Sequence, residues 1–261
     1  MRVRDIGPLD EPVVLFGGPY SNLQALEALS QTIGERPAIC TGDVVGYCAD
    51  PVATVDLMRA MAVHCIAGNC ERQVAEGGLD CGCGFEAGST CDRLSQGWYS
   101  YLSDTCDPDT IAWLADQPEI GVLTQFGRRY GVVHGGVTAI SRFIWPDTPD
   151  EVFLEEISAL ENRIGQVDGV IAGHCGVAFH RRIGRHQWIN AGVIGLPPHD
   201  GRPATRYGIL TKGDVVFERL SYDHASARKA MRAAGLTQGY EETLTTGIWP
   251  SDDVLPFSLR R

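Results

Sequence analysis

The sequence has no long apolar run, and it has fewer basic than acidic residues. No stretch approaches the roughly 18 apolar residues that a membrane-spanning helix needs, so we expect a soluble, cytoplasmic protein with no membrane partner. Lys and Arg total 22 against 33 Asp and Glu, which gives a formal net charge of −11. This charge argues against binding to a nucleic-acid duplex or to an anionic membrane, because neither surface attracts an acidic protein.

Two motifs of common enzyme classes are also missing. No catalytic Ser/His/Asp context occurs, and the pair Gly17-Gly18 lacks the lysine and the spacing of a phosphate-cradling loop. No internal repeat or low-complexity segment is present. The nine cysteines are an odd number in a chain of 261 residues, which indicates reduced intracellular thiols rather than a secreted disulfide framework.

The first half of the chain alternates short apolar runs with amphipathic segments. The apolar runs predict strands, and the periodic segments predict helices, the first of them capped by Ser21. The predicted strands cover 13–16, 37–40 and 65–67, and the predicted helices cover 22–29 and 52–61. This alternation indicates an α/β fold with ligands at the carboxyl ends of strands.

Residues 72–107 interrupt the alternation. The segment is rich in Gly, Cys, Ser and Asp, and we expect an inserted loop or small lid subdomain within a single domain that spans residues 1–261. After it, short strands separated by glycine-containing turns predict a second, antiparallel or mixed sheet. The later helices are predicted at 108–116, 150–164 and 225–234, and the strands at 120–126, 130–133, 177–183, 187–190, 207–211 and 215–220. Two sheets with outer helices predict a four-layer α/β/β/α sandwich.

Four polar side chains follow predicted strands and have glycine next to them. They are Asp43, Asn69, His134 and His174. Carboxylate, amide and imidazole groups suit a hard or borderline metal ion, and glycine lets the backbone turn sharply enough for such ligands to converge. The sequence therefore predicts a metal site at the carboxyl ends of these strands.

The order of these motifs resembles that of the calcineurin-like metallophosphoesterases, in particular their compact bacterial phosphodiesterase branch. The resemblance runs from about residue 13 to about residue 235. It rests on Asn22-Leu23 with the helix that follows, Gly42-Asp43, Gly68-Asn69-Cys70-Glu71, Val133-His134-Gly135, Gly173-His174 and the segment from Ile189 to Pro197. In that family two metal ions share a bridging aspartate and clamp a phosphoryl group.

The resemblance implies one complete set of metal ligands. Asp43 matches the bridging ligand, and Asn69, His134 and His174 match the remaining ligands of the same ion. The ion would be divalent or ferric, with Mn, Zn, Ni and Fe all compatible with these ligand types. The implied activity is phosphoric ester hydrolysis on a small phosphorylated substrate, either a phosphomonoester, a phosphodiester or a nucleotide.

This chain lacks three of the residues that usually bind the other metal ion in the family. Gly18, Tyr20 and Gly176 stand where the family has Asp, His and His, so we expect a mononuclear site. Tyr20 and Cys175 have two interpretations. They are either atypical ligands, which requires that they ionise, or uncharged groups that cap the site.

Cys70 and Arg72 are the predicted catalytic residues beside the metal. The family often has a histidine at the position of Cys70, where it is a candidate acid for the leaving group, and Arg72 is close enough to the motif to contact a phosphate. The alternative for Cys70 is a small buried hydrophobe.

Four more cysteines lie in the segment 72–107, and they are Cys81, Cys83, Cys91 and Cys106. A Zn or iron–sulfur site, a redox-sensitive pair and inert thiols are the three interpretations of this group. For the whole chain we therefore expect a metal-dependent hydrolase. The alternatives are a non-catalytic protein that binds a phosphorylated ligand and a redox-responsive protein.

Overall fold

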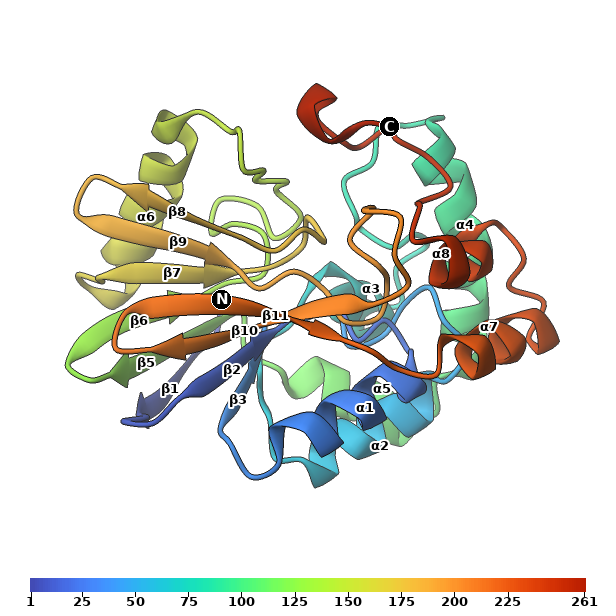
Figure 1. Ribbon diagram of the computed structural model, residues 1–261, viewed down its shortest axis with the longest axis horizontal. Coiled ribbons are helices and arrows are strands. Elements are labelled where there is room, and N and C mark those ends of the chain that lie inside the picture. Colours follow the sequence, from blue (N-terminus) through green and yellow to red (C-terminus); the bar gives the residue numbers. More distant parts are fainter.

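Two β-sheets pack face to face in the computed structural model, which describes residues 1–261 (Figure 1). The six-stranded sheet has the order β1-β5-β6-β7-β9-β8, and the five-stranded sheet has the order β11-β10-β2-β3-β4. The six strands are β1 (Val3–Pro8), β5 (Ile120–Gln125), β6 (Arg128–Val132), β7 (Gly169–Ala172), β8 (Phe179–Ile183) and β9 (His186–Asn190). The five strands are β2 (Val13–Phe16), β3 (Ala38–Cys40), β4 (His64–Cys65), β10 (Thr205–Thr211) and β11 (Asp214–Leu220).

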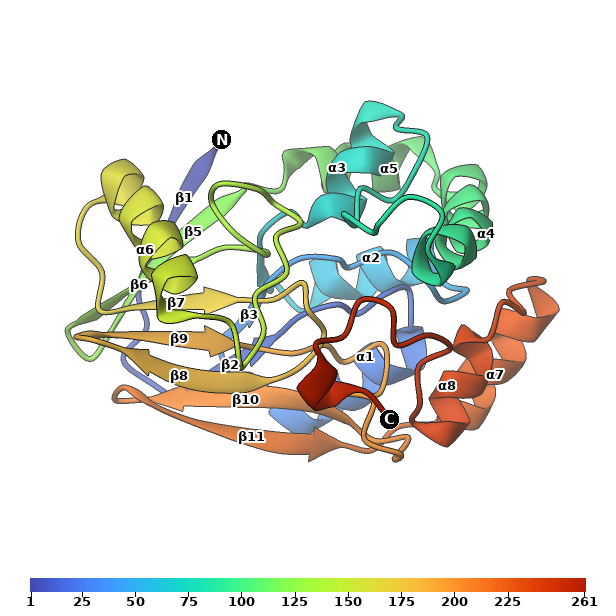
Figure 2. The same ribbon diagram turned by 90° about the horizontal axis from the view of Figure 1, so that it is seen from above.

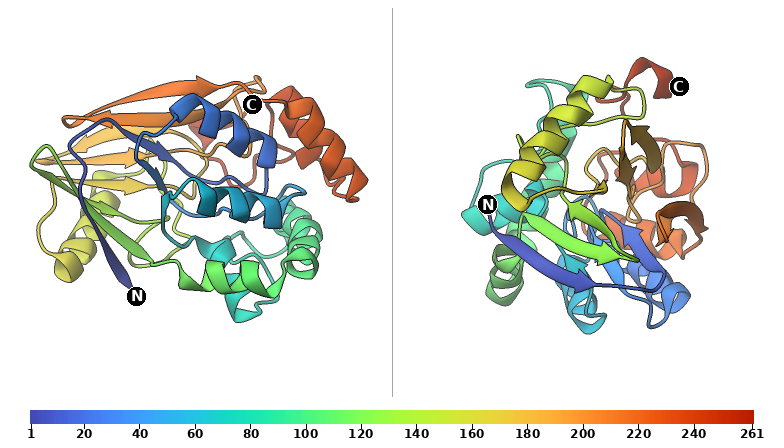
Figure 3. Two further views of the ribbon diagram at one scale, coloured as in Figure 1. Left: turned by 90° about the horizontal axis from the view of Figure 1, so that it is seen from below. Right: turned by 90° about the vertical axis from the view of Figure 1, so that its left-hand side faces the viewer.

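Helices cover the outer faces of both sheets. Helix α6 (Asp150–Ile164) lies on the six-stranded sheet, and α1 (Leu23–Ile33) and α2 (Pro51–Ala60) lie on the five-stranded sheet (Figure 2 and Figure 3). The other helices are α3 (Asn69–Glu76), α4 (Thr90–Thr105), α5 (Pro108–Asp116), α7 (His224–Ala233), α8 (Tyr240–Thr246) and a 3-10 turn (Phe257–Leu259). None of the helices is both long and apolar enough to cross a membrane.

The side chains of β2 show how the layers are built. Val13 and Leu15 lie in the apolar cluster between the two sheets, where they meet Ile171 of β7. Val14 and Phe16 point the other way, into the cluster beneath the helices of the five-stranded sheet. A third cluster joins α6 to the outer face of the six-stranded sheet. These clusters confirm the predicted four-layer α/β/β/α sandwich.

The strand assignment differs from the prediction in two places. Strand β1 has no predicted counterpart, because its residues are mostly exposed and carry no apolar alternation, and it pairs in parallel with β5. The prediction also places residues 207–220 in the second sheet. The structure instead pairs β10 antiparallel with β2, so this hairpin extends the five-stranded sheet. Alternation shows which face of a strand is buried but not which strand it pairs with.

Two helical features also differ from the prediction. The segment 72–107 contains α4, a 16-residue helix that begins with a capping hydrogen bond at Ser89, rather than an irregular loop throughout. The cap of α1 is Asn22 and not Ser21, since the Asn22 Oδ1 atom accepts a hydrogen bond from the Ala25 N–H at 3.1 Å.

Candidate metal centre

The four predicted metal ligands lie at the carboxyl ends of neighbouring strands. Asp43 follows β3, Asn69 begins α3 after β4, His134 follows β6, and His174 follows β7. Parallel strands end at the same edge of a sheet, so the two residues from each sheet lie close together. The edges of the two sheets meet here, and both sheets contribute to one site. The ligand atoms of Asp43, His134 and His174 all lie within 4.8 Å of one another, and these residues are 3%, 2% and 7% exposed. The structure therefore brings the predicted ligands together in a buried cluster.

The ring of His134 is the centre of the cluster. Its Nδ1 atom lies 2.6 Å from the carbonyl oxygen of Thr41, which can only accept, so Nδ1 carries the proton and donates. In the neutral ring Nε2 then presents a lone pair. This atom lies 3.0 Å from Asn69 Oδ1, 3.1 Å from His174 Nδ1 and 3.3 Å from Asp43 Oδ2.

The orientation of Asn69 adds a further hydrogen-bond acceptor to the atoms around His134 Nε2. Its Nδ2 atom donates to the carbonyl oxygen of Cys81 at 2.8 Å, which turns the amide oxygen towards His134. Several acceptor atoms held this close, away from water, need a cation between them, either a proton on Nε2 or a metal ion. Imidazole, amide and carboxylate groups are ligands for borderline metal ions, so the residues present fit a metal ion.

The pKa values in the cluster follow from burial and from the charges that face each other. Burial alone would raise the pKa of Asp43, but the charge of His134 and the hydrogen bond to it lower this pKa below its ordinary value. Burial alone would lower the pKa of His134, but Asp43 raises it. Burial and the charge of His134 lower the pKa of His174 to about 3. The His174 ring therefore stays neutral and keeps a lone pair for a cation.

Glu71 positions the metal loops, a role that the sequence analysis does not assign. Its side chain is fully buried, and its Oε2 atom accepts hydrogen bonds from the Asp43 and Gly68 N–H groups, each at 2.7 Å. Its Oε1 atom accepts from the Val45 N–H at 3.3 Å. Burial and the charge of Asp43 raise the pKa of Glu71 to about 7. The sequence signal for this role is an acidic residue at the third position of a helix, which is typical of a helix cap.

Aromatic rings fill the places of the missing ligands. A Cβ atom at Gly18 would lie 2.6 Å from Val193 Cγ1 and 2.7 Å from Tyr20 Cζ, and one at Gly176 would lie 3.1 Å from Trp249 Cη2. Both glycines have positive φ, 42° and 79°, which larger residues rarely adopt. A carboxylate at the first position would require Val193 or Tyr20 to shift, and an imidazole at the second would press against Trp249. The rings of Tyr20 and Trp249 therefore leave little space for either missing ligand.

The pKa values of Tyr20 and Cys175 are both raised by burial. Burial, followed by the charge of Asp43, raises the pKa of Tyr20 well above its ordinary value. Burial raises the pKa of Cys175 to about 12, and the Asn190 Nδ2 atom donates to its Sγ atom at 3.3 Å. Cys175 also stands outside the close group of Asp43, His134 and His174, and the Tyr20 ring packs edge-to-face on Tyr47, which favours the capping interpretation.

Restoring one missing histidine is expected not to restore a second metal ion. In Gly176→His the new side chain would meet Trp249, and we expect a loss of about 1–3 kcal/mol in the free energy of unfolding. Urea denaturation and elemental analysis measure the two effects. Gly184→His is the matched control, because Gly184 also has positive φ but has open space around it. A Gly176→His variant that is as stable as Gly184→His and binds an extra ion would contradict this account.

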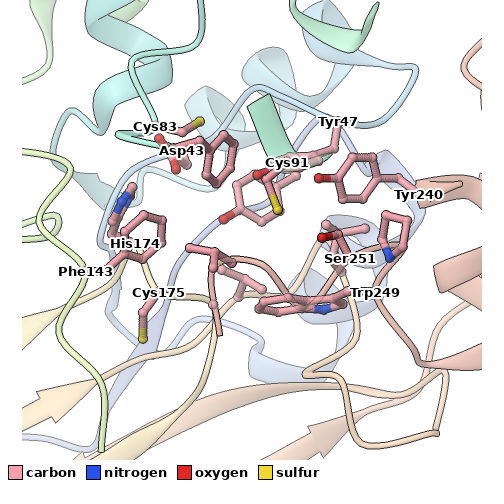
Figure 4. Close-up of a pocket in the computed structure, with 17 residues that line it drawn as sticks. Asp43, Tyr47, Cys83, Cys91, Phe143, His174, Cys175, Tyr240, Trp249 and Ser251 are labelled. Atoms are coloured by element: carbon pink, nitrogen blue, oxygen red, sulfur yellow. The ribbon is translucent and has the colours of Figure 1, made fainter. Parts of the chain in front are cut away.

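A cavity lies beside Asp43 and His174 (Figure 4). The segment 72–107 contributes part of its lining, with Cys83, Phe85 and Cys91. The C-terminal segment contributes another part, with Trp249, Pro250, Ser251 and Val254. The two segments are joined, since the Thr90 N–H donates to Asp253 Oδ2 at 2.6 Å. Both segments therefore lie beside Asp43 and His174, and the lid role predicted for residues 72–107 stays a prediction.

Cys70 and Arg72, the predicted catalytic residues, do not line this cavity. Cys70 is fully buried, and its N–H group donates to Asp43 Oδ1 at 3.2 Å. Arg72 forms an ion pair with Glu119, which holds its guanidinium group. The structure therefore uses the backbone of Cys70 to orient Asp43, and it brings neither side chain to the cavity.

The cysteines of the segment 72–107 do not form one cluster. Cys83 lies beside Cys81, and the Asn69 Nδ2 atom lies 3.4 Å from Cys83 Sγ. All nine cysteines are buried and free of disulfides. Asp43, His134 and His174 form the one close group of three His, Cys, Asp or Glu side chains in the chain, so the structure gives no support to a Zn or iron–sulfur site built from these thiols.

Comparisons with known proteins agree with the fold. A metallophosphoesterase from Sphaerobacter thermophilus aligns with a TM-score of 0.70 and 21% identity, over 91% of this chain and 99% of that chain. A hypothetical protein from Pyrococcus horikoshii OT3 aligns with a TM-score of 0.76 and 16% identity, over 90% of this chain and 98% of that chain. No curated protein matches the sequence significantly. The family profile described as calcineurin-like phosphoesterase matches residues 6–215, and the chain therefore belongs to the calcineurin-like phosphoesterase family.

Proposed function

We propose that this chain is a metal-dependent phosphoesterase that works with one metal ion, held by Asp43, Asn69, His134 and His174. The observation that carries the proposal is the meeting of three ligand atoms within 3.0–3.3 Å of His134 Nε2. When bound, such an ion supplies Lewis-acid chemistry, which polarises a phosphoryl oxygen and makes water a better nucleophile. Membership of the family supports the same class of reaction.

The protein fixes these ligands before a substrate arrives. The carbonyl of Thr41 holds the ring of His134, and Glu71 ties the backbone of Asp43 to the start of α3. Burial keeps the ring of His174 neutral. Groups held in this way need little rearrangement when charge develops on a phosphoryl group.

The cavity offers little acid catalysis for a leaving group. The Cys70 thiol does not reach it, and the pKa of Tyr20 is well above its ordinary value because of burial. General acid catalysis works best when the pKa of the acid lies near the working pH. We therefore propose slow hydrolysis of small phosphomonoesters, phosphodiesters or nucleotides, with the fastest rates for esters whose leaving groups need no proton.

Metal removal is expected to abolish hydrolysis reversibly. Protein loaded with Mn, Zn, Ni or Fe is expected to hold one ion per chain, because the structure contains one set of ligands. A chelator is expected to lower the rate on a chromogenic phosphoester by at least about 100-fold, since a metal ion contributes several kcal/mol to the transition state. Elemental analysis and steady-state kinetics measure the two quantities.

Asp43→Asn is the matched variant for this test, since it removes the charge of the carboxylate and keeps its shape. We expect it to lose both bound metal and activity. Asp214→Asn, at an exposed position of β11, is the control and is expected to change neither. Two ions per chain, or full activity in Asp43→Asn, would refute the proposal.

A non-catalytic role is the second candidate, and the rings at Gly18 and Gly176 favour it. Tyr20 and Trp249 occupy the places of the missing ligands, so the two-metal clamp of the family cannot form around them. In this case the metal-loaded protein would bind inorganic phosphate in a calorimeter and would hydrolyse no ester with any of the four metals.

A further inference from the structure

The cavity beside the metal ligands is an aromatic pocket. Twelve of its 17 lining residues are hydrophobic. Figure 4 shows Phe143 beside His174 at one end, and Tyr240 and Trp249 at the other. The ring centroids of Phe143 and His174 are 4.3 Å apart. The apolar wall therefore begins directly at a metal ligand, with no polar zone between them.

The cavity contains no cation of its own. No lysine or arginine lines it, and Asp43 is its one carboxylate. A phosphoryl group would therefore find positive charge only at a metal ion held by Asp43 and His174. A second anionic group deeper in the cavity would be buried without a partner, which costs several kcal/mol or more.

The aromatic wall is held in place by its own packing. Tyr47 lies between Tyr20 and Tyr240, with ring centroids 4.5 Å and 4.8 Å apart, in edge-to-face geometry. Trp249 is anchored because its Nε1 atom donates to the carbonyl oxygen of Pro197 at 2.7 Å. A preformed wall loses little conformational freedom on binding, so it is suited to a flat apolar group.

The size of the cavity limits the group that it takes. Its volume of ≈ 50 Å³ corresponds to a few water molecules, since one water needs roughly 10–15 Å³ on this scale. A single aromatic ring displaces a similar number of waters and so fits this cavity, whereas a sugar with its base would extend into the neighbouring cavity of ≈ 380 Å³, which shares Phe85, Cys91, Phe143 and Val254 with it. Phe143 lies directly beside His174, so a ring next to the phosphoryl group would contact this apolar wall.

We propose, on the basis of the function proposed above, that this cavity binds an aromatic ring attached directly to the phosphoryl group. The preferred ligands are then aryl phosphoesters that carry no second negative charge. The rings that replace the ligands of the second metal, Tyr20 and Trp249, form part of this binding surface. In this proposal the same two rings account both for the loss of the second metal ion and for the specificity for aryl groups.

Phosphonates test the proposal without turnover, because their P–C bond is not hydrolysed. Calorimetry on the metal-loaded full chain gives the Kd of each ligand. Phenylphosphonate is expected to bind at least about tenfold more tightly than methylphosphonate, because its ring leaves water for an apolar wall. We expect 4-carboxyphenylphosphonate to lose that advantage, since its carboxylate meets no cation. Cytidine 5′-monophosphate is expected to bind more weakly than phenylphosphonate.

Variants locate the effect in the wall. Tyr240→Ala and Trp249→Ala are each expected to reduce the phenyl-to-methyl ratio of Kd values to below about threefold, with little change for methylphosphonate. Phe257→Ala is the control, because Phe257 is an aromatic residue of the same C-terminal segment and is 91% exposed. If Tyr240→Ala or Trp249→Ala does not fold, the Kd values of the ligand series on the unchanged protein test the proposal by themselves.

The outcomes separate the two proposals. Equal affinity for phenylphosphonate and methylphosphonate would overturn the aryl specificity and leave the metal-dependent phosphoesterase intact. Tighter binding of the nucleotide would overturn direct attachment of the ring. If the metal-loaded protein binds neither inorganic phosphate nor any phosphonate, both the proposed function and this inference are wrong.

Discussion

Replacing His134 by alanine is expected to lower the phosphoesterase rate at least about 1000-fold and to abolish tight metal binding. The Nε2 atom of His134 lies within 3.0–3.3 Å of three other ligand atoms, so its loss removes the centre of the site. A metal ion supplies several kcal/mol of charge stabilisation in phosphoryl transfer, and about 4 kcal/mol corresponds to roughly a 1000-fold change in rate.

Two measurements check this result. Steady-state kinetics with excess metal gives kcat/KM, and a metal titration followed by calorimetry gives the affinity. The control is His180→Ala, at an exposed position of β8, which is expected to keep both values. Near-UV circular dichroism shows whether His134→Ala keeps its tertiary packing. A folded His134→Ala variant within tenfold of the original rate would remove this residue from the mechanism.

The ligand loops can be predicted from the sequence because their signals are local. Each ligand follows a short apolar run and stands beside a glycine, and a buried parallel strand that ends in a tight turn requires this pattern. Asp43 and His174 adopt φ of 55° and 62°, left-handed values that the polar, ligand-bearing turns impose. The four-layer architecture follows from the same alternation of strands and helices, which the apolar clusters confirm.

Features that depend on distant partners could not be predicted in this way. Trp249 closes over Gly176 from a C-terminal segment whose sequence shows no periodic pattern, and only the folded chain brings the two together. Arg72 stands beside a ligand motif, but its guanidinium group is held by Glu119. Strand β1 and the β10–β11 hairpin have partners that no pattern of burial specifies. Sequence motifs therefore located the residues that meet in the buried cluster, and packing determines what surrounds them.

Glu71→Ala is expected to destabilise the protein by about 4 kcal/mol and to lower its melting temperature by about 10 °C. The Glu71 carboxylate is fully buried and accepts short hydrogen bonds from the Asp43 and Gly68 N–H groups. Alanine would leave both donors buried without partners, at about 1–3 kcal/mol each. In a chain of this size about 1 kcal/mol corresponds to a shift of roughly 2–4 °C. Urea and thermal denaturation measure these two quantities.

The same carboxylate couples stability to the metal site, because it joins the loop of Asp43 to the helix that begins with Asn69. We therefore expect Glu71→Ala to weaken metal binding although Glu71 is no ligand. Glu71→Gln is expected to be intermediate, since its amide oxygen can still accept from the Asp43 and Gly68 N–H groups, whereas its NH₂ group cannot accept from the Val45 N–H. Glu76→Ala, at an exposed position of the same helix, is the control. If Glu71→Ala loses stability but binds metal as tightly as the unchanged protein, Glu71 stabilises the fold without positioning Asp43.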